Sequence, residues 1–342
     1  MIHVHAVRDS NTRSAAARTN KVFKIFVDGE AGTTGLQIYE RLSKRDDVEI
    51  LRISPELRKD VSERKRLINE SDVTFLCLPD AAAVESASLC TNPKTKIIDA
   101  STAHRTNPDW AYGLPELSRE YREAIQKNAR IANPGCHATG FILGVYPLIA
   151  AGILQRSADI ATYSLTGYSG GGKKMIAAYE ADGAQISHPG MSPRLFAPRP
   201  YALGHHHKHL PEMQKVCGLE KPPVFNPIVG PYYEGMAVSS AIFPASLSRK
   251  VSASDLQQIL SAHYEDSRFV KVFPYEEEPT LDAGSLDPTE CNGTNEAHIY
   301  VFGKGESLQV TTIIDNLGKG ASGAAIQNMN IALGIDEKTS LA

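Results

Sequence analysis

Short apolar strands alternate with helical stretches over the first 135 of the 342 residues. The run from Lys21 to Gly29 predicts a buried strand, because its apolar residues alternate and it ends in a glycine turn. Further strands are expected at 48–54, 72–80 and 96–101, with helices between them at 34–44, 63–69 and 81–89. Strands and helices that alternate at this spacing predict a parallel, doubly wound sheet.

The pattern changes after Gly135. A long apolar helix is expected at 137–154, followed by β-rich segments with many prolines and glycines, and by a last amphipathic helix at 321–333. A chain of this length exceeds the roughly 250–300 residues that one core supports. We therefore expect a second α/β domain with a mostly antiparallel sheet, whose exposed face would favour a homodimer or homotetramer.

Composition excludes several classes of partner. A net charge of -3 gives no electrostatic reason to expect nucleic acid or a membrane, and no apolar run reaches the ~18 residues of a membrane span. The five cysteines are scattered and form no CxxC pair, which disfavours disulfides and a structural metal site. A reducing, cytoplasmic location fits best. Residues 1–20 lack the apolar core of a secretory signal and are expected to be a disordered tail.

The glycine-rich turn after the first strand predicts a phosphate-binding loop. It consists of Gly29, Gly32, Thr33, Thr34 and Gly35, together with Glu30 and Ala31. Glycines let backbone N–H groups approach a pyrophosphate, which a helix N-terminus also attracts. The GxxGxxG spacing departs from GxGxxG, so an ordinary turn is the alternative. The place of the turn in the first strand–helix unit favours a dinucleotide cofactor.

The end of the second strand bears on the choice between NAD and NADP. NAD-binding proteins usually carry an acidic residue there, whereas Ser54, Arg58 and Lys59 could hold a 2′-phosphate. Glu56 argues the other way, and these side chains could equally form a solvated charged loop. We expect NADP(H).

Cys136 is the candidate nucleophile. It follows Pro134-Gly135, which predicts a turn, and it precedes the long apolar helix, so it lies at a helix N-terminus where a thiolate is stabilised. A buried cysteine acting as a small apolar side chain is the alternative, and Cys77 in an apolar strand fits that description better.

A cysteine nucleophile needs a partner for proton transfer, and four histidines lie between 205 and 209. A polar surface segment is the plain alternative. Zinc is disfavoured because no Cys or acidic ligand is close in sequence and zinc ligands usually come from distinct elements. Ser101 and Arg105 follow the fourth strand, where ligands of open α/β sheets bind, so they are candidates for phosphate binding.

Five motifs occur together in order: GEAGTTG at 29–35, YGLPEL at 112–117, NPGCHATG at 133–140, HKHLPEM at 207–213 and DNLGKGASGAAIQNMN at 315–330. From about Lys21 to Gly334 the chain resembles the N-acetyl-gamma-glutamyl-phosphate reductases, in their shorter variant. The segment 166–173 departs from the longer variety, which has a Gly-Ala-Gly-Arg run there.

The resemblance implies a dinucleotide-binding domain at 21–135 plus 318–342, with an inserted domain of the glyceraldehyde-phosphate-dehydrogenase type at 136–317. It implies Cys136 as nucleophile and a histidine of HKH as acid/base, with His207 expected first and His209 second. It also implies Asn316 near the nicotinamide, and Glu116 is a candidate for the amino-acyl end of the substrate.

The expected reaction is NADPH-dependent reduction of N-acetyl-gamma-glutamyl phosphate to its semialdehyde through a cysteine thioester, as in arginine biosynthesis. The same chemistry on N-acetyl-aminoadipyl phosphate is an alternative, because one methylene changes binding by only ~1–3 kcal/mol. The chain could also reduce aspartyl phosphate, act as a non-catalytic NADP-binding sensor, or be a zinc hydrolase.

Overall fold

The computed structural model describes residues 21–180, 195–279 and 281–341. The tail expected at 1–20 lies outside the described residues. Within the described residues, no helix is both long enough and apolar enough to cross a membrane.

The first sheet is parallel, as the sequence predicts. Its order is β2-β1-β3-β4-β6-β5, and every neighbouring pair runs in the same direction. The strands are β1 Phe23–Asp28, β2 Val48–Leu51, β3 Val73–Leu76, β4 Lys96–Asp99, β5 Ala111–Tyr112 and β6 Arg130–Ala132. In the centre of the sheet Ile25 of β1 pairs with Ile50 on one side and Val73 on the other.

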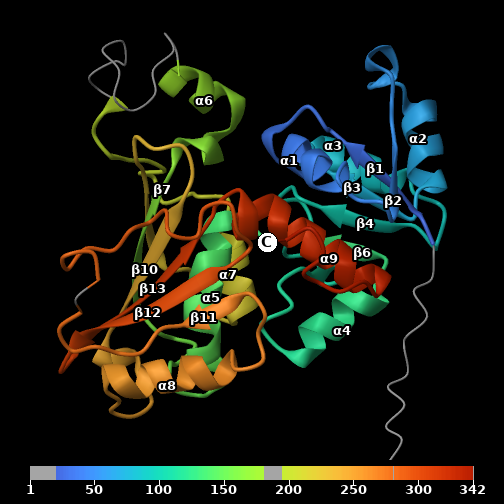
Figure 1. Cartoon of the computed structure of the whole chain (residues 1–342). Helices are drawn as coiled ribbons and strands as arrows, with labels where there is room; N and C mark the ends of the chain where they lie inside the picture. Colours follow the sequence, from blue (N-terminus) through green and yellow to red (C-terminus); the bar gives the residue numbers. More distant parts are fainter. Residues whose placement is uncertain (1–20, 181–194, 280, 342) are drawn as a thin grey trace, which may run out of the picture.

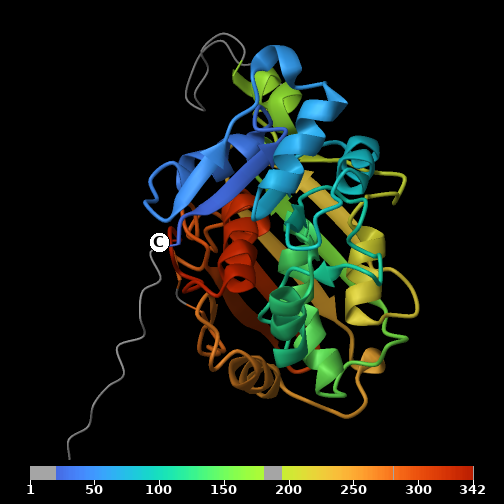
Figure 2. The ribbon, with the colours of Figure 1, turned by 90° about the vertical axis from the view of Figure 1, so that its right-hand side faces the viewer.

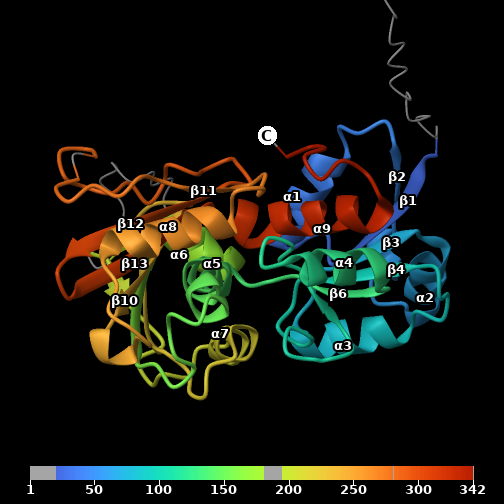
Figure 3. The same ribbon diagram turned by 90° about the horizontal axis from the view of Figure 1, so that it is seen from below.

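Helices cover both faces of this sheet, which confirms the doubly wound arrangement (Figure 3). The helices are α1 Thr33–Leu42, α4 Arg119–Lys127 and α9 Gly323–Leu333 on one face, and α2 Val61–Glu70 and α3 Asp80–Ser88 on the other. On the first face Ile38, Ile125 and Met329 form one core cluster with strand residues. On the second face Leu67 and Ala83 pack with Phe26.

The second sheet has the order β11-β12-β13-β10-β7-β9-β8. Its strands are β7 Ile160–Thr166, β8 Arg199–Pro200, β9 Val224–Val229, β10 Met236–Ile242, β11 Val270–Val272, β12 Ala297–Lys304 and β13 Ser307–Ile314. Four of its six pairings are antiparallel, and β11 with β12 and β7 with β9 are parallel. The prediction of a mostly antiparallel second sheet is confirmed.

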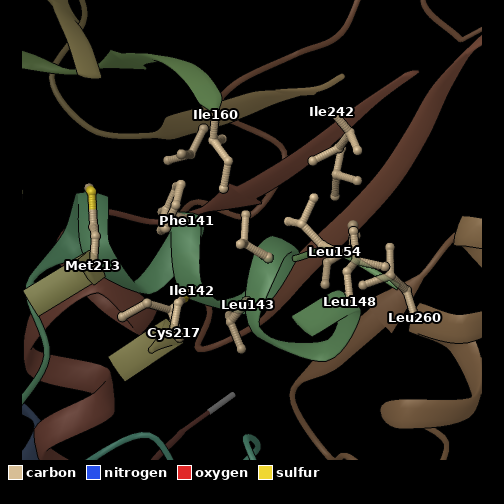
Figure 4. Close-up of a cluster of buried hydrophobic side chains, with 14 of the residues drawn as sticks. Phe141, Ile142, Leu143, Leu148, Leu154, Ile160, Met213, Cys217, Ile242 and Leu260 are labelled. Atoms are coloured by element: carbon tan, nitrogen blue, oxygen red, sulfur yellow. The ribbon is translucent and has the colours of Figure 1, made fainter. Parts of the chain in front are cut away.

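The main core lies between this second sheet and helix α5, Cys136–Ala150 (Figure 4). Phe141, Ile142 and Leu143 of α5 are 1% exposed or less, because the helix is apolar on nearly all sides. Helices α7 Leu210–Cys217 and α8 Ala253–His263 contribute to the same core. The remaining helix, α6 Gly172–Glu180, follows β7.

Helix α9 lies beside the N-terminal strands, although the two segments are at opposite ends of the chain (Figures 1 and 2). Its residues Ala325, Ile326 and Met329 share a core cluster with Ile25 and Val27 of β1. The segment before α9, the π-helical turn Gly318–Ser322, runs from the second sheet back to the first. The domain boundaries expected from the sequence stay a prediction.

Candidate active site

One cavity of about 500 Å³ is lined by residues of both halves of the molecule. The glycine-rich turn lies on one side of it, and the N-terminus of α5 and the histidine segment lie on the other. Of the predicted site residues, the lining includes Gly32, Thr33, Thr34, Gly35, Arg105, Cys136, His207, His209 and Asn316. Residues far apart in the sequence therefore meet here.

Cys136 is the first residue of α5, directly after the N-cap Gly135. Burial raises the pKa of its thiol above the ordinary value, and the backbone N–H of His137 and the charges of Arg105 and Lys208 oppose that rise. The expected stabilisation of a thiolate is thus present but does not outweigh desolvation. The thiol therefore needs a base to accept its proton.

His209 lies against Gly135, the neighbour of the nucleophile. A Cβ atom added to Gly135 would be 2.4 Å from Nε2 of His209, so only glycine permits this approach. The imidazole is buried, and its Nδ1 has no hydrogen-bond partner. Burial, followed by the charge of Arg105, holds its pKa well below the ordinary value, so the ring is neutral near neutral pH.

His207 supports His209. Its Nδ1 accepts a hydrogen bond from the backbone N–H of His209 at 3.1 Å, and the two ring centres are 4.7 Å apart. The ring of His207 also packs against His137 and Phe225. Burial lowers the pKa of His207 to about 4.

Arg105 reaches the cavity but is held by protein groups. Its guanidinium donates to the carbonyls of Asn133 and Ala100 and to Oε2 of Glu212 at 3.1 Å. Ser101 is not brought to the cavity, because its buried hydroxyl donates to Asp99 at 2.8 Å.

Glu212 is a site residue that the sequence analysis missed. It is 1% exposed, and its Oε1 accepts from the backbone N–H of Gly135 at 2.9 Å and from the hydroxyl of Tyr112 at 2.7 Å. Glu212 follows His209 by three residues at the start of α7, and residues with this spacing lie on the same face of a helix. The spacing was therefore a signal in the sequence that could have identified Glu212. Glu212 therefore fixes both the turn that carries Cys136 and the guanidinium of Arg105 beside it.

The glycine-rich turn has the geometry that its sequence predicts. Gly29 has φ +92°, and a Cβ atom there would lie 2.4 Å from the carbonyl oxygen of Cys77. Gly32 caps α1 without a side-chain hydrogen bond, so the N-terminal N–H groups of that helix face the cavity uncapped. Uncapped N–H groups at a helix N-terminus are a geometry that can accept a phosphate group.

Ser54, Arg58 and Lys59 are exposed beyond the end of β2 and do not line the cavity. Arg58 lies 3.7 Å from Glu30 of the glycine-rich turn, so this loop adjoins the turn.

Asn316 lies on the cavity wall, where Oδ1 accepts from the N–H of Gly235 at 2.8 Å and Nδ2 donates to Ser169 at 3.0 Å. The following turn covers the nucleophile: a Cβ atom added to Gly320 would be 2.7 Å from Cβ of Cys136.

Glu116 is not brought to the cavity. It is buried and accepts from Nζ of Lys319 at 2.5 Å and from Gln327 at 2.8 Å. Burial by itself raises the pKa of this carboxyl, but Lys319 and Gln327 hold it below the ordinary value. The structure therefore places Glu116 in a buried ion pair with the turn that precedes α9.

A parallel sheet whose first turn is rich in glycine, joined to a second sheet by a helix that begins at a cysteine, is the architecture of a two-domain dehydrogenase. The family comparison agrees. Residues 24–127 match the NAD binding domain of semialdehyde dehydrogenase, and residues 136–316 match its dimerisation domain.

Relatives with higher sequence identity identify one group within the semialdehyde dehydrogenases. The chain is 44% identical over 327 residues to N-acetyl-gamma-glutamyl-phosphate reductase 2 of Nostoc sp., covering 93% of this chain and 99% of the relative. It is 42% identical to the protein of the same name from Pseudomonas putida, covering 91% and 96%. The chain therefore belongs to the semialdehyde dehydrogenase family and, within it, to the N-acetyl-gamma-glutamyl-phosphate reductases that the sequence resembles.

Solved structures with the same fold include aspartate semialdehyde dehydrogenases. The protein from Francisella tularensis has a TM-score of 0.69 at 16% identity, covering 91% of this chain and 99% of that one. Aspartate semialdehyde dehydrogenase II from Vibrio cholerae has a TM-score of 0.68 at 16% identity, covering 92% and 99%.

Proposed function

We propose that this chain is an NADPH-dependent reductase of N-acetyl-gamma-glutamyl phosphate, which forms N-acetyl-glutamate 5-semialdehyde and phosphate for arginine biosynthesis. The observation that carries the proposal is the single cavity in which Cys136, His209 and the glycine-rich turn meet. The names of the relatives supply the substrate.

The chemistry begins at the thiol of Cys136. Transfer of its proton to His209 gives a thiolate, which attacks the γ-acyl carbon and forms a thioester with release of phosphate. NADPH, when bound, supplies the hydride that reduces this thioester. His209 is favoured as the acid/base because its ring adjoins Gly135, with His207 as the alternative; this reverses the order expected from the sequence.

Binding of the cofactor is assigned to the turn Gly29–Gly35, whose uncapped helix end would hold the pyrophosphate. Asn316 is assigned to the nicotinamide side, and Ser54, Arg58 and Lys59 to the 2′-phosphate. Arg105 is the candidate for binding the substrate phosphate. Among the described residues, it is the one cationic side chain of the cavity lining that lies beside Gly135.

The test is the reverse reaction, in which NADPH formation is followed by absorbance with N-acetyl-glutamate semialdehyde and phosphate. We expect turnover in the wild type, dependence on phosphate, poor use of NAD, and no turnover in Cys136→Ala. Cys217→Ala is the matched control, because this cysteine is buried in the core and does not line the cavity. Equal rates in Cys136→Ala and the wild type would remove the cysteine from the mechanism. Turnover only with the aminoadipyl or aspartyl semialdehyde would replace the substrate.

The oligomer is proposed to be a homodimer or homotetramer in the cytoplasm. A match to a dimerisation domain supports assembly, and Tyr163 and Val224 on neighbouring strands of the second sheet are exposed apolar residues. All five cysteines are free, which suits a reducing compartment. Sedimentation equilibrium should give two or four times the chain mass of 37.1 kDa.

A further inference from the structure

A second group of side chains with metal-binding chemistry lies outside the active site. Glu290, Cys291 and His298 place a carboxylate oxygen, a sulfur and an imidazole nitrogen within 4.8 Å of one another. In the described residues 21–180, 195–279 and 281–341, no other three His, Cys, Asp or Glu side chains gather this closely. None of the three residues lines the active-site cavity.

The three side chains lie at different depths. Cys291 is 1% exposed, and its Sγ lies 3.5 Å from the carbonyl oxygen of Ile313 on β13. His298, on β12, is half-buried, and Glu290 is exposed. The cluster is therefore closed on the side of the sulfur and open to solvent on the side of the carboxylate.

The sulfur, nitrogen and oxygen atoms of these three side chains favour zinc over other metal ions. Zinc binds thiolate sulfur, imidazole nitrogen and carboxylate oxygen with four ligands in all. Calcium and magnesium prefer oxygen ligands throughout, so a site with sulfur and nitrogen disfavours them.

Neighbouring residues form hydrogen bonds with the ligand side chains, as in established zinc sites. Nε2 of His298 lies 2.9 Å from Oε2 of Glu296, while its Nδ1 faces Glu290 at 2.7 Å. Metal-bound histidines usually donate the other ring N–H to a carboxylate in this way. Lys271 lies 2.6 Å from the same Glu296 oxygen, and the hydroxyl of Tyr300 donates to Glu290 at 3.0 Å.

We infer that Glu290, Cys291 and His298 bind one zinc ion, with water as the fourth ligand. The adjoining Gly293 donates its N–H to Asp315 at 2.9 Å, and Asp315 directly precedes Asn316 on the wall of the active-site cavity. Zinc at this cluster braces the loop that supports that wall.

The test is equilibrium dialysis of the full chain against zinc after treatment with a chelator, with bound metal counted per chain. We expect one equivalent in the wild type and its loss in Cys291→Ala and His298→Gln. Glu296→Gln should weaken binding by about 10–100-fold, because it removes only the residue behind the histidine. Cobalt should show a thiolate charge-transfer absorption in the wild type that is absent from Cys291→Ala.

Cys136→Ala and His206→Ala are the matched controls, since the active-site thiol and an exposed histidine are the other places where zinc could bind. Both should retain the full equivalent. Loss of zinc in either control, equal zinc in Cys291→Ala and the wild type, or no bound zinc in the wild type would overturn the inference. If Cys291→Ala does not fold, as judged by circular dichroism, the half-buried His298→Gln decides the question by the same measurement.

Discussion

At the scale of single residues, burial sets the protonation of the active site. It raises the pKa of Cys136 and lowers the pKa of His137 to about 3 and that of His207 to about 4. It also holds the pKa of His209 well below the ordinary value, so this imidazole is neutral and free to accept a proton, as the base of a cysteine–histidine pair must be.

His209→Asn should lower kcat by about 10²–10⁴, the usual contribution of positioned proton transfer. His207→Asn should cost less than about tenfold, because His207 acts through its hydrogen bond to the backbone of His209. Steady-state kinetics at saturating substrate, with urea unfolding as the folding control, measures both. A larger loss of kcat in His207→Asn than in His209→Asn would make His207 the acid/base, as the sequence analysis expected.

His137 should make the protein sensitive to acid. Its Nδ1 and Nε2 are hydrogen-bonded to Ser164 and Tyr201 at 2.8 Å, and burial lowers its pKa from 6.5 to about 3. As the pH falls below about 6.5 the unfolded chain binds a proton that the folded chain excludes, so stability is complete above that pH and is lost below it. At about pH 5 the loss from this residue should be about 2 kcal/mol.

Urea unfolding at neutral pH and at about pH 5 measures this effect in the wild type and in His137→Gln. The pH-dependent loss should be smaller in the variant by the contribution of His137. An identical loss in both proteins would show that other groups carry the acid sensitivity.

At the scale of elements, the sequence analysis predicted the strands and helices whose apolar residues recur at the period of a strand or of a helix. The polar helix α4 was missed because Ile125 is its one buried residue. Helix α8 was missed although it carries a capping box of Ser252 and Asp255, a signal that the sequence displays. The helix predicted at 137–154 ends at Ala150, since Gly152 adopts a positive φ just beyond it.

The first turn can be tested by Gly29→Ala with Gly152→Ala as its control. Both positions have positive φ, so the backbone strain of each substitution should cost about 1–2 kcal/mol of unfolding free energy, to which Gly29→Ala adds the cost of a steric clash. A Cβ atom at Gly152 meets nothing within 4 Å, whereas one at Gly29 meets the backbone oxygen of Cys77 at 2.4 Å. We therefore expect only Gly29→Ala to weaken NADPH binding, measured by titration of nucleotide fluorescence. Equal NADPH affinity in both variants would mean that this turn does not hold the nucleotide.

At the scale of the whole molecule, buried polar contacts hold the segment that leads from the second sheet back to the first. Lys319 is 0% exposed and lies between Glu116, from the loop after β5, and Gln327 of α9. These contacts fix the turn Gly318–Ser322 over Cys136, so packing within the first half also positions the site.

Lys319→Met should lower the unfolding free energy by about 3–5 kcal/mol, because it leaves the carboxylate of Glu116 buried and unpaired. The double variant Glu116→Gln/Lys319→Met should recover part of that loss, since no buried charge remains. Urea unfolding of both variants checks this. A double variant no more stable than Lys319→Met would show that the charge of Glu116 is not the cause.

The sequence by itself determined the parallel sheet, the glycine-rich turn and the position of Cys136. Each depends on neighbours within a turn or a strand: an apolar period, a backbone angle open to glycine, or a Pro-Gly turn before an apolar helix. Only the tertiary structure decided that Glu212 holds Arg105, that His209 rather than His207 adjoins the nucleophile's turn, and that Glu116 pairs with Lys319. Arg105 and Glu212 are 107 residues apart, and Glu116 and Lys319 are 203 apart. Their meeting depends on how segments far apart in the chain pack in the folded molecule, which local periodicity does not encode.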